Sequence, residues 1–252
     1  KNRIGVVYGV GIGGMITFEE EVGNWSRTGS TIGPKFSPFF IPKMIADICA
    51  GQISIMYGFH GPNFITSSAC ASSSNALAEA FNLIRLGKAD MIVSGGAEAA
   101  ILPSGVGGFN AMHALSTRND EPEKASRPLS ASRDGLVMAD GSACLILEEL
   151  EHAKKRNAPI LAEIIGFGTN SDGKHVTQPN SETMAQAMEL ALQDANLSSD
   201  KIEYINMHGT ATPTGDIAET IAVSKVLGNR IPVSTLKNYT GHTLGACGAI
   251  EA

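Results

Sequence analysis

Four side chains in this sequence could act together in nucleophilic chemistry: Cys70, His208, Lys237 and His242. Cys70 follows a short strand-like run and precedes a helical stretch, so its thiol is placed at the positive end of a helix dipole. Unpaired amide hydrogens there favour the thiolate and can lower a cysteine pKa from about 8.5 into the range of about 3.5–7.5. The alternative interpretation of Cys70 is a buried, inert thiol.

The two histidines and the lysine follow apolar runs that are typical of strands. His208 follows residues 204–207 and opens a loop of glycine, threonine and proline, while Lys237 and His242 follow residues 231–235. Ligands of open α/β sheets gather at the carboxyl ends of strands. Taken singly, a turn histidine or a solvated lysine remains the alternative. A cysteine at a helix start and these three groups in one cleft would suit acyl transfer through a covalent thioester.

The remaining cysteines, Cys49, Cys144 and Cys247, are expected to be buried, reduced and inert. No two cysteines form a Cys-x-x-Cys pair, so the sequence predicts neither a metal site nor a redox pair. Four cysteines in 252 residues are few for a disulfide scaffold, and reduced thiols indicate a cytoplasmic location.

Residues 9–14 read Gly-Val-Gly-Ile-Gly-Gly after a strand and match the pattern of a dinucleotide-binding loop. That loop needs an acidic residue about 20 positions further on, at the end of a second strand. Residues 31–35 read Thr-Ile-Gly-Pro-Lys and offer no acid. We therefore interpret these glycines as turn residues, and we expect no cofactor.

Short apolar runs rich in β-branched residues alternate with amphipathic stretches, a pattern that predicts an α/β protein with a largely parallel sheet. The expected strands are residues 4–8, 64–66, 91–94, 143–147, 161–167, 204–207 and 231–235. The expected helices are residues 71–86, 182–195 and 216–227. The charged segment 148–159 is either a connection between two α/β halves or an exposed helix.

The composition limits the class of protein. With 252 residues, 43% apolar residues and 17% charged residues, the chain is long enough for one or two globular domains. Its net charge of −6 argues against nucleic acid as a partner. The long uncharged stretches 61–78 and 99–117 are broken by polar residues, glycine and proline, so no membrane span is predicted. The chain begins without Met, and we expect a segment of a longer protein, incomplete at both ends.

Several short motifs occur in the order found in one family of condensing enzymes. They are Ser-Pro-Phe-Phe-Ile-Pro at residues 37–42, Ala-Cys-Ala-Ser at 69–72, Gly-Gly-Ala-Glu at 95–98, Arg-Pro to Arg-Asp-Gly at 127–135, His-Gly-Thr at 208–210, and Lys237 with Gly-His at 241–242. With these motifs the chain resembles the β-ketoacyl-acyl-carrier-protein synthases, closest to the elongating type II form. The resemblance implies a thiolase-like, layered αβαβα architecture of two similar halves, here residues 1–150 and 151–252.

The resemblance also implies roles for the four candidate residues. Cys70 would accept the acyl chain, His208 and His242 would bind the malonyl thioester carbonyl, and Lys237 would organise this histidine pair. The implied reaction is the decarboxylating Claisen condensation of malonyl-acyl carrier protein with a Cys-bound acyl chain in fatty-acid elongation. The implied partners are acyl carrier protein, in its acyl and malonyl forms, and a second copy of the chain in a homodimer.

Two finer expectations accompany these roles. The acidic carrier protein should dock on local basic residues, and Lys35, beside the motif at 37–42, is the candidate. Asn206 and Glu251 lie where family members can hold a buried monovalent cation.

Four alternative functions differ from this one in the residues that they require. A ketosynthase of polyketide assembly would use the same chemistry on different chains. A non-catalytic partner of the chain-length-factor kind would lack the nucleophile, whereas this chain has Cys70. A thiolase would need a second catalytic cysteine where this chain offers histidine and lysine, and a nicotinamide-dependent enzyme would need the acidic residue missing from the glycine loop.

Overall fold

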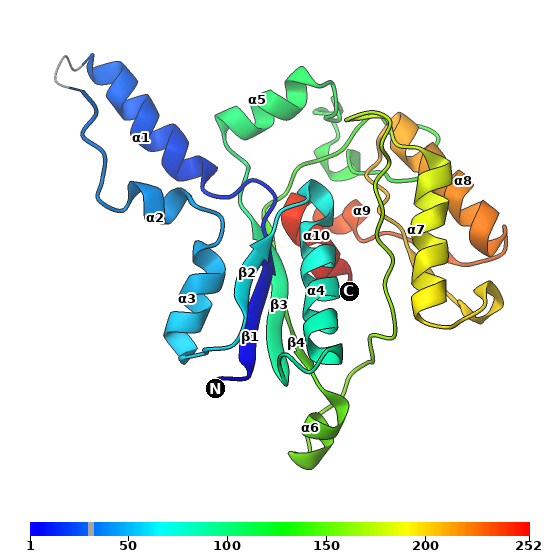
Figure 1. Cartoon of the computed structure of the whole chain (residues 1–252). Coiled ribbons are helices and arrows are strands. Elements are labelled where there is room, and N and C mark those ends of the chain that lie inside the picture. Colours follow the sequence, from blue (N-terminus) through cyan, green and yellow to red (C-terminus); the bar gives the residue numbers. More distant parts are fainter. Residues whose placement is uncertain (30–32) are drawn as a thin grey trace.

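The apolar β-branched run at the start of the chain becomes the centre of a mixed four-stranded sheet. The computed structural model describes residues 1–29 and 33–252, and its main sheet has the order β2-β1-β3-β4. The strands are β1 Ile4–Gly9, β2 Asn63–Thr66, β3 Met91–Glu98 and β4 Gly141–Glu148. β1 pairs in parallel with β2 and β3, and β4 pairs antiparallel with β3 (Figure 1).

Helices surround this sheet and form a second group beside it. The helices are α1 Met15–Thr28, α2 Phe40–Met44, α3 Ile48–Tyr57, α4 Ser72–Arg85, α5 Pro103–Ala111, α6 Leu150–Lys155, α7 Ser181–Asp194, α8 Pro213–Leu227, α9 Lys237–Thr240 and α10 Cys247–Glu251. The short 3-10 turns are η1 Ala69–Ala71, η2 Pro122–Lys124, η3 Ser199–Lys201 and η4 Leu244–Ala246.

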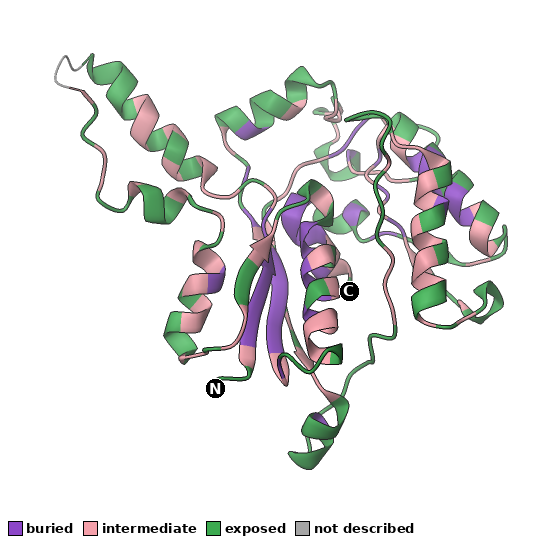
Figure 2. Cartoon of the chain, viewed as in Figure 1, coloured by how far each residue is buried: buried purple, intermediate pink, exposed green. Residues whose placement is uncertain are grey.

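The core lies between the central strands and the helices that cover them. α3 packs on β1 and β2, whereas α4 packs on β1 and β3, with α10 beside α4 (Figure 1). Val6 and Val7 of β1 have no solvent exposure. They belong to a continuous apolar run, which is typical of strands in a sheet that is covered on both faces. The small buried face of α4, which includes Ala76 and Ala80, brings this helix close to the sheet. Figure 2 shows the buried residues concentrated in β1, β3 and the facing sides of these helices.

One close approach fixes where α4 begins. Gly9 ends β1, and a Cβ atom there would lie 2.3 Å from the backbone nitrogen of Ser73. Only glycine therefore lets the first turn of α4 rest on the end of β1. This contact sets the position of Cys70, which lies two residues before the start of α4.

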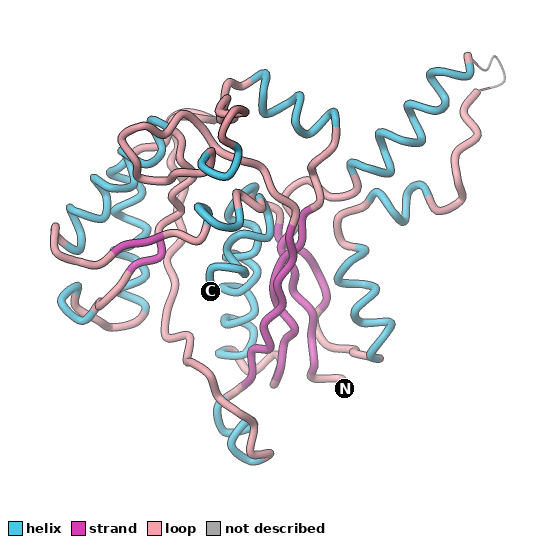
Figure 3. The backbone as a smooth tube through the Cα atoms, turned by 180° about the vertical axis from the view of Figure 1, so that it is seen from behind, coloured by secondary structure: helices cyan, strands magenta, loops and turns pink. Residues whose placement is uncertain are grey.

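The second group of elements carries His208. β5 Ile205–Asn206 and β6 Val233–Ser234 form a separate two-stranded parallel sheet beside α7 and α8 (Figure 3). α7 and α8 pack on each other, and the irregular segment from residue 156 to 180 connects α6 to α7 (Figures 1 and 3).

Most of the predicted elements are confirmed, with shifted ends. Six expected strands are found: residues 4–8 as β1, 64–66 as β2, 91–94 as β3, 143–147 as β4, 204–207 as β5 and 231–235 as β6. The expected helices are found as α4 (71–86), α7 (182–195) and α8 (216–227). Segment 148–159 contains the exposed helix α6. Asn180 caps α7, where its side-chain oxygen accepts the Glu182 N–H at 3.2 Å.

The strand expected at residues 161–167 is wrong. This segment is extended, but no ladder joins it to another strand among the described residues, and Leu161 is 98% exposed. An apolar β-branched run forms a strand only where a neighbour supplies hydrogen-bond partners and cover.

Within residues 1–29 and 33–252, none of the helices has the length and the apolar stretch needed to cross a membrane.

Candidate active site

Cys70 sits in a tight turn between β2 and α4. The turn η1 places Ala69 at φ 50°, a left-handed conformation that costs a non-glycine residue about 1–3 kcal/mol. Ser72 holds the turn closed: its hydroxyl donates to the Ala69 carbonyl at 2.7 Å and accepts the Ser68 N–H at 2.9 Å. The predicted position at a helix start is confirmed, since α4 begins at Ser72.

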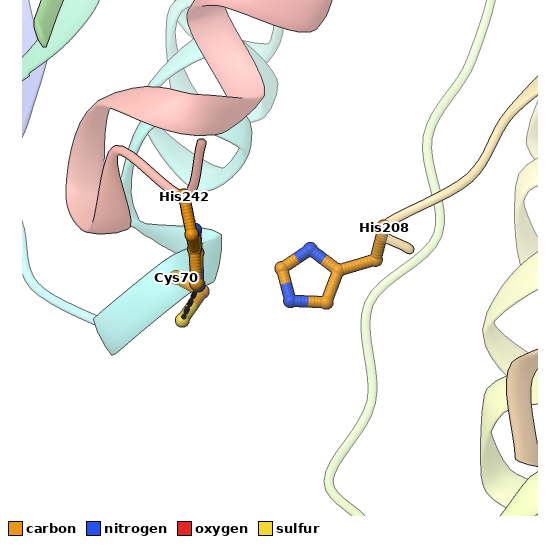
Figure 4. Close-up of side chains that lie close together, drawn as sticks. All are labelled: Cys70, His208 and His242. Carbon is orange, nitrogen blue, oxygen red and sulfur yellow. Dashed lines mark hydrogen bonds between the residues drawn. The ribbon is translucent and has the colours of Figure 1, made fainter. Parts of the chain in front are cut away.

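His242 contacts the sulfur directly. Its Nε2 atom lies 3.0 Å from the Sγ atom of Cys70 (Figure 4). On the other side of the ring, the N–H of Leu244 donates to Nδ1 at 3.3 Å. A neutral imidazole carries one proton, so an accepting Nδ1 leaves that proton on Nε2. The ring therefore presents an N–H donor toward the space beside the sulfur.

His208 completes the cluster from the two-stranded sheet. Its ring centre lies 5.2 Å from that of His242, and the two rings are nearly perpendicular at 86°. Figure 4 shows the His208 ring reaching from its own loop toward Cys70 and His242. Two of the predicted histidines and the predicted cysteine, which are remote in sequence, thus face one another.

Burial keeps both rings neutral at physiological pH. Burial and, second, the positive charge of Lys237 together lower the pKa of His242 to about 4. Burial, Lys237 and His242, in that order, hold the pKa of His208 well below its usual range. Neutral imidazoles can donate a hydrogen bond to a developing negative charge without first losing a proton.

Lys237 is the electrostatic centre of this cluster. The residue is only 1% exposed, and its ammonium group forms an ion pair with the carboxylate of Glu251. Burial raises the pKa of Glu251, although Lys237 opposes that shift. Because Lys237 lowers the pKa of Cys70 as well as of both histidines, the predicted site residues are electrostatically coupled.

The sulfur itself departs from the sequence-based expectation. Burial raises the pKa of Cys70, and Lys237 opposes this only in part. The predicted lowering is therefore wrong in its net direction, because removing a thiolate from water outweighs the nearby positive charge. Cys70 rests as a thiol that is partly accessible to solvent.

The other cysteines differ from one another. Cys247 is buried as predicted: its thiol donates to the Cys70 carbonyl at 3.2 Å, and burial raises its pKa to about 12. Cys49 is partly buried, and burial raises its pKa. The prediction is wrong for Cys144, which is exposed because it occupies an outward-facing position of β4.

The spacing of the cluster also resembles a metal site, but its hydrogen bonds do not. The ligand atoms of Cys70, His208 and His242 all lie within 4.8 Å of one another. A metal-binding histidine usually donates its second ring N–H to an acceptor. Here Nδ1 of His242 accepts the Leu244 N–H instead, so the lone pair of Nε2 is occupied by a proton. At His242 the arrangement suits an N–H donor better than a metal ligand.

The expectation of a monovalent cation at Asn206 and Glu251 stays a prediction. The Oδ1 atom of Asn206 is buried without a hydrogen-bond partner among the described residues, as a cation ligand would be. Glu251, however, is engaged by Lys237.

A loop network anchors His208 from its own side. The carboxylate of Glu219 on α8 accepts the backbone N–H groups of His208 at 2.5 Å and Gly209 at 2.8 Å. Burial raises the pKa of Glu219. The sequence-based interpretation missed Glu219. The available signal was an acidic residue one to two turns into the first helix after the His208 loop.

Asp216 connects the same loop to the motif at residues 127–135. Its carboxylate accepts the N–H of Ala211 at 3.1 Å and of Leu129 at 2.7 Å, and it lies 3.5 Å from Nε of Arg133. This motif therefore supports the His208 loop.

The glycine loop at residues 9–14 is confirmed as structural. Its backbone N–H groups, which would face a phosphate in a dinucleotide site, are bonded to the buried carboxylate of Glu98. Glu98 belongs to the motif Gly-Gly-Ala-Glu at residues 95–98, but the sequence does not reveal its role because its partners are backbone atoms.

Known proteins are similar to this chain over nearly its whole length. Residues 1–153 match the family described as beta-ketoacyl synthase, N-terminal domain, and residues 161–252 match beta-ketoacyl synthase, C-terminal domain. The chain is 47% identical over 255 residues to 3-oxoacyl-(acyl-carrier-protein) synthase 2 of Coxiella burnetii, covering 99% of this chain and 61% of that protein. It is 44% identical over 256 residues to the chloroplastic 3-oxoacyl-(acyl-carrier-protein) synthase I of Arabidopsis thaliana, covering 100% of this chain and 54% of that protein.

Solved structures share the fold. A beta-ketoacyl synthase from Burkholderia phymatum superposes with a TM-score of 0.92 at 46% identity, over 99% of this chain and 60% of that one. A ketosynthase bound to a hexaketide and solved with its type II polyketide acyl-carrier protein gives a TM-score of 0.94 at 34% identity, over 99% of this chain and 63% of that one. The chain spans about three-fifths of the length of most relatives it matches.

Proposed function

The chain belongs to the beta-ketoacyl synthase family, and from this premise we propose that it carries the condensing site of a fatty-acid-elongating 3-oxoacyl-acyl-carrier-protein synthase. Cys70 is the acyl-accepting nucleophile, His208 and His242 are the donors to the malonyl thioester, and Lys237 organises them. The contact of 3.0 Å between the Cys70 Sγ and the His242 Nε2, beside a second neutral ring, is the observation that carries the proposal.

In the first half-reaction, an acyl chain passes from the phosphopantetheine thiol of acyl carrier protein to Cys70. The sulfur attacks the thioester carbonyl, a new carbon–sulfur bond forms, and the carrier thiol leaves with the proton that Cys70 loses. Because burial raises the pKa of Cys70, this sulfur needs help to ionise. The positive charge of Lys237 and the Nε2–H of His242 supply it, since both favour the thiolate.

In the second half-reaction, malonyl-carrier protein enters and loses carbon dioxide. The electron pair of the broken carbon–carbon bond moves into the thioester carbonyl and forms an enolate. The ring N–H groups of His208 and His242 stabilise the enolate oxygen, and such a donor typically contributes about 10²–10³ in rate. Neutral rings suit this task, and the lowered pKa values of both histidines keep them neutral.

The enolate carbon then attacks the acyl carbonyl on Cys70. A carbon–carbon bond forms, the bond to the sulfur breaks, and the β-ketoacyl product stays on the carrier protein. The backbone N–H of Cys70 is the donor for the oxyanion of this step, because it lies in the tight turn at the start of α4.

Fatty-acid elongation is favoured over polyketide assembly by the similarity to named relatives. The synthases named 3-oxoacyl-(acyl-carrier-protein) synthase are 44–47% identical to this chain, whereas the polyketide ketosynthase is 34% identical. A non-catalytic chain-length factor is disfavoured because the chain has the nucleophile Cys70 and both histidines.

The proposed partners are acyl carrier protein and a second copy of the chain. Lys35 is exposed beside the motif at residues 37–42 and offers a positive charge to the acidic carrier protein. β2 is an edge strand with Asn63 and Phe64 exposed, so an equivalent strand of a second copy can pair with it.

Four free cysteines fit a reducing compartment such as the cytoplasm.

The test of the nucleophile is Cys70→Ala in the intact natural protein. Condensation should be abolished, while decarboxylation of malonyl-carrier protein should persist because the histidine pair remains. Cys144→Ala is the matched control, since it removes an exposed thiol on β4 and should leave both reactions unchanged. Condensation at the normal rate in Cys70→Ala would contradict the assignment.

The carrier surface is tested by Lys35→Glu, which should raise the KM for acyl carrier protein with little change in kcat. Lys88→Glu is the matched control, because Lys88 is exposed just beyond the far end of α4 from Cys70. An unchanged KM in Lys35→Glu would remove Lys35 from the docking surface.

A further inference from the structure

A buried carboxylate behind the site has no assigned task in the reaction. Glu98 ends β3 and is only 5% exposed, and no ion pair involves it among the described residues. Its Oε2 accepts the N–H of Gly11 at 2.9 Å and of Gly245 at 3.1 Å. Its Oε1 accepts the N–H of Ile12 at 3.1 Å and of Gly13 at 3.3 Å. Four backbone donors from two loops thus converge on one side chain.

One of these loops is the loop of His242. Gly245 directly follows Leu244, whose N–H donates to the Nδ1 atom of His242. Leu244 has φ 49°, a left-handed conformation that a bulky residue adopts only when its surroundings impose it. The hydrogen bond from Gly245 to Glu98 restrains the peptide unit immediately after Leu244, and with it the orientation of the amide that fixes the histidine ring.

The two loops approach so closely that the carboxylate joins them into one unit. A Cβ atom on Gly245 would lie 2.3 Å from the backbone nitrogen of Gly11 and 2.7 Å from the Oε2 of Glu98. Glu98 therefore connects the loop after β1 in the N-terminal part of the chain to the turn η4, which follows His242.

We propose that Glu98 is a positioning residue that holds His242 in the ring orientation and tautomer needed to donate from Nε2. It acts through Gly245 and Leu244 and does not touch the reacting atoms. The consequence for catalysis rests on the function proposed above, whereas the consequence for the ring can be measured in the resting protein.

The hydrogen-bond pattern demands a carboxylate at this position. A glutamine has one oxygen and one NH₂ group, and the NH₂ group cannot accept a hydrogen bond. In either amide orientation, two of the four backbone N–H groups would face another donor. An aspartate keeps both acceptors and the charge but is one methylene shorter, so it should restore part of the function.

The kinetic test measures decarboxylation of malonyl-carrier protein in the intact natural protein with Cys70→Ala, where condensation does not interfere. Adding Glu98→Gln should lower kcat about tenfold, less than the 10²–10³ expected for removing the donor itself, with KM within about twofold. The kcat of Glu98→Asp should lie between that of the protein with unchanged Glu98 and that of Glu98→Gln. The matched control is Glu19→Gln, because Glu19 also accepts a backbone N–H, that of Ser104 at 3.0 Å, but belongs to α1.

The structural test reads the protonation of His242 by ¹⁵N NMR of histidine-labelled protein. In the protein with unchanged Glu98, we expect the proton on Nε2, and in Glu98→Gln we expect a mixture of tautomers. A proton on Nδ1 with Glu98 present would overturn the proposal even if the variants failed to fold.

The two tests separate this proposal from the proposed function. If Cys70→Ala does not decarboxylate malonyl-carrier protein but His242 has the expected tautomer and loses it in Glu98→Gln, the function fails and the positioning role stands. If decarboxylation is present and Glu98→Gln leaves both kcat and the tautomer unchanged, the positioning role is wrong.

Discussion

The two histidine loops are held in place by different means. His208 follows β5, and the carboxylate that anchors its backbone, Glu219, comes from α8, the next helix in the chain. His242 follows α9, and its backbone N–H donates to the Val137 carbonyl at 2.7 Å while Glu98 holds Gly245. The backbone N–H of His208 is therefore held by a neighbour in sequence, and that of His242 by a distant segment of the chain.

This difference matters because only the second ring contacts the sulfur. His242 lies against Cys70, and Glu98, which supports its loop, belongs to the sheet whose strand β2 leads to the cysteine. His208 approaches from the other group of elements and meets the site across the space between the rings. The nucleophile and its nearest donor therefore form one structural unit, to which His208 is added.

The largest expected effect falls on Lys237, whose positive charge acts on both histidines. Lys237→Met leaves the carboxylate of Glu251 buried without its partner, which should lower the free energy of unfolding by about 3–5 kcal/mol in urea titrations. Lys237→Met combined with Glu251→Gln should recover most of that loss. Lys124→Met, which breaks an exposed pair with Glu121, is the control and should change stability by less than about 1 kcal/mol.

Removing either ring should separate their two roles. His208→Ala and His242→Ala should each slow decarboxylation by about 10²–10³, because each removes one donor to the enolate oxygen. Only His242→Ala should also slow alkylation of Cys70 by iodoacetamide at neutral pH, because only that ring donates to the sulfur. Equal alkylation rates in the two variants would remove the distinction between the loops.

The stability of the protein should depend on pH through His242. Its pKa is about 4 in the folded protein and about 6.5 in an unfolded chain, so between these values the unfolded state binds more protons. The stabilisation is complete above pH 6.5 and is lost as the pH falls toward 4. The difference in unfolding free energy between the natural protein and His242→Gln should shrink by about 3 kcal/mol over this window.

His175→Gln is the control for that titration, since it removes an exposed imidazole instead of the buried one. A His242→Gln variant with the same pH profile as the natural protein would show that this ring does not titrate as described.

The smallest expected effect concerns the local anchor of the first loop. Glu219→Gln keeps only one oxygen for the N–H groups of His208 and Gly209, which should cost about 1–3 kcal/mol of stability. Alkylation of Cys70 should be unaffected, because the His242 loop has its own support. A slowed alkylation in this variant would mean that the two loops are coupled.

The sequence was sufficient for what local pattern determines. The β-branched runs predicted the central strands, the 3.6-residue periodicity predicted α4 and α7, and the motifs selected Cys70, His208, Lys237 and His242. The run at residues 161–167 has the same local signal as a strand, but strand formation depends on a neighbour that the run itself does not specify.

The remaining features depend on contacts between remote segments. The raised pKa of Cys70 reflects burial, which cannot be summed from its neighbours in sequence. The same holds for Glu98, whose four partners are backbone N–H groups on two loops. A glycine motif therefore matched a phosphate-binding pattern while its donors are bonded to a carboxylate of the chain itself.

The most direct measurement is to find where the acyl group goes. The intact protein is incubated with acyl-carrier protein alone, digested at low pH and mapped by mass spectrometry, with Cys49, Cys144 and Cys247 as internal references. A single acyl thioester on the peptide that contains Cys70 is the predicted result. Acylation of a different residue, or condensation that proceeds with an unmodified Cys70, would contradict the central claim.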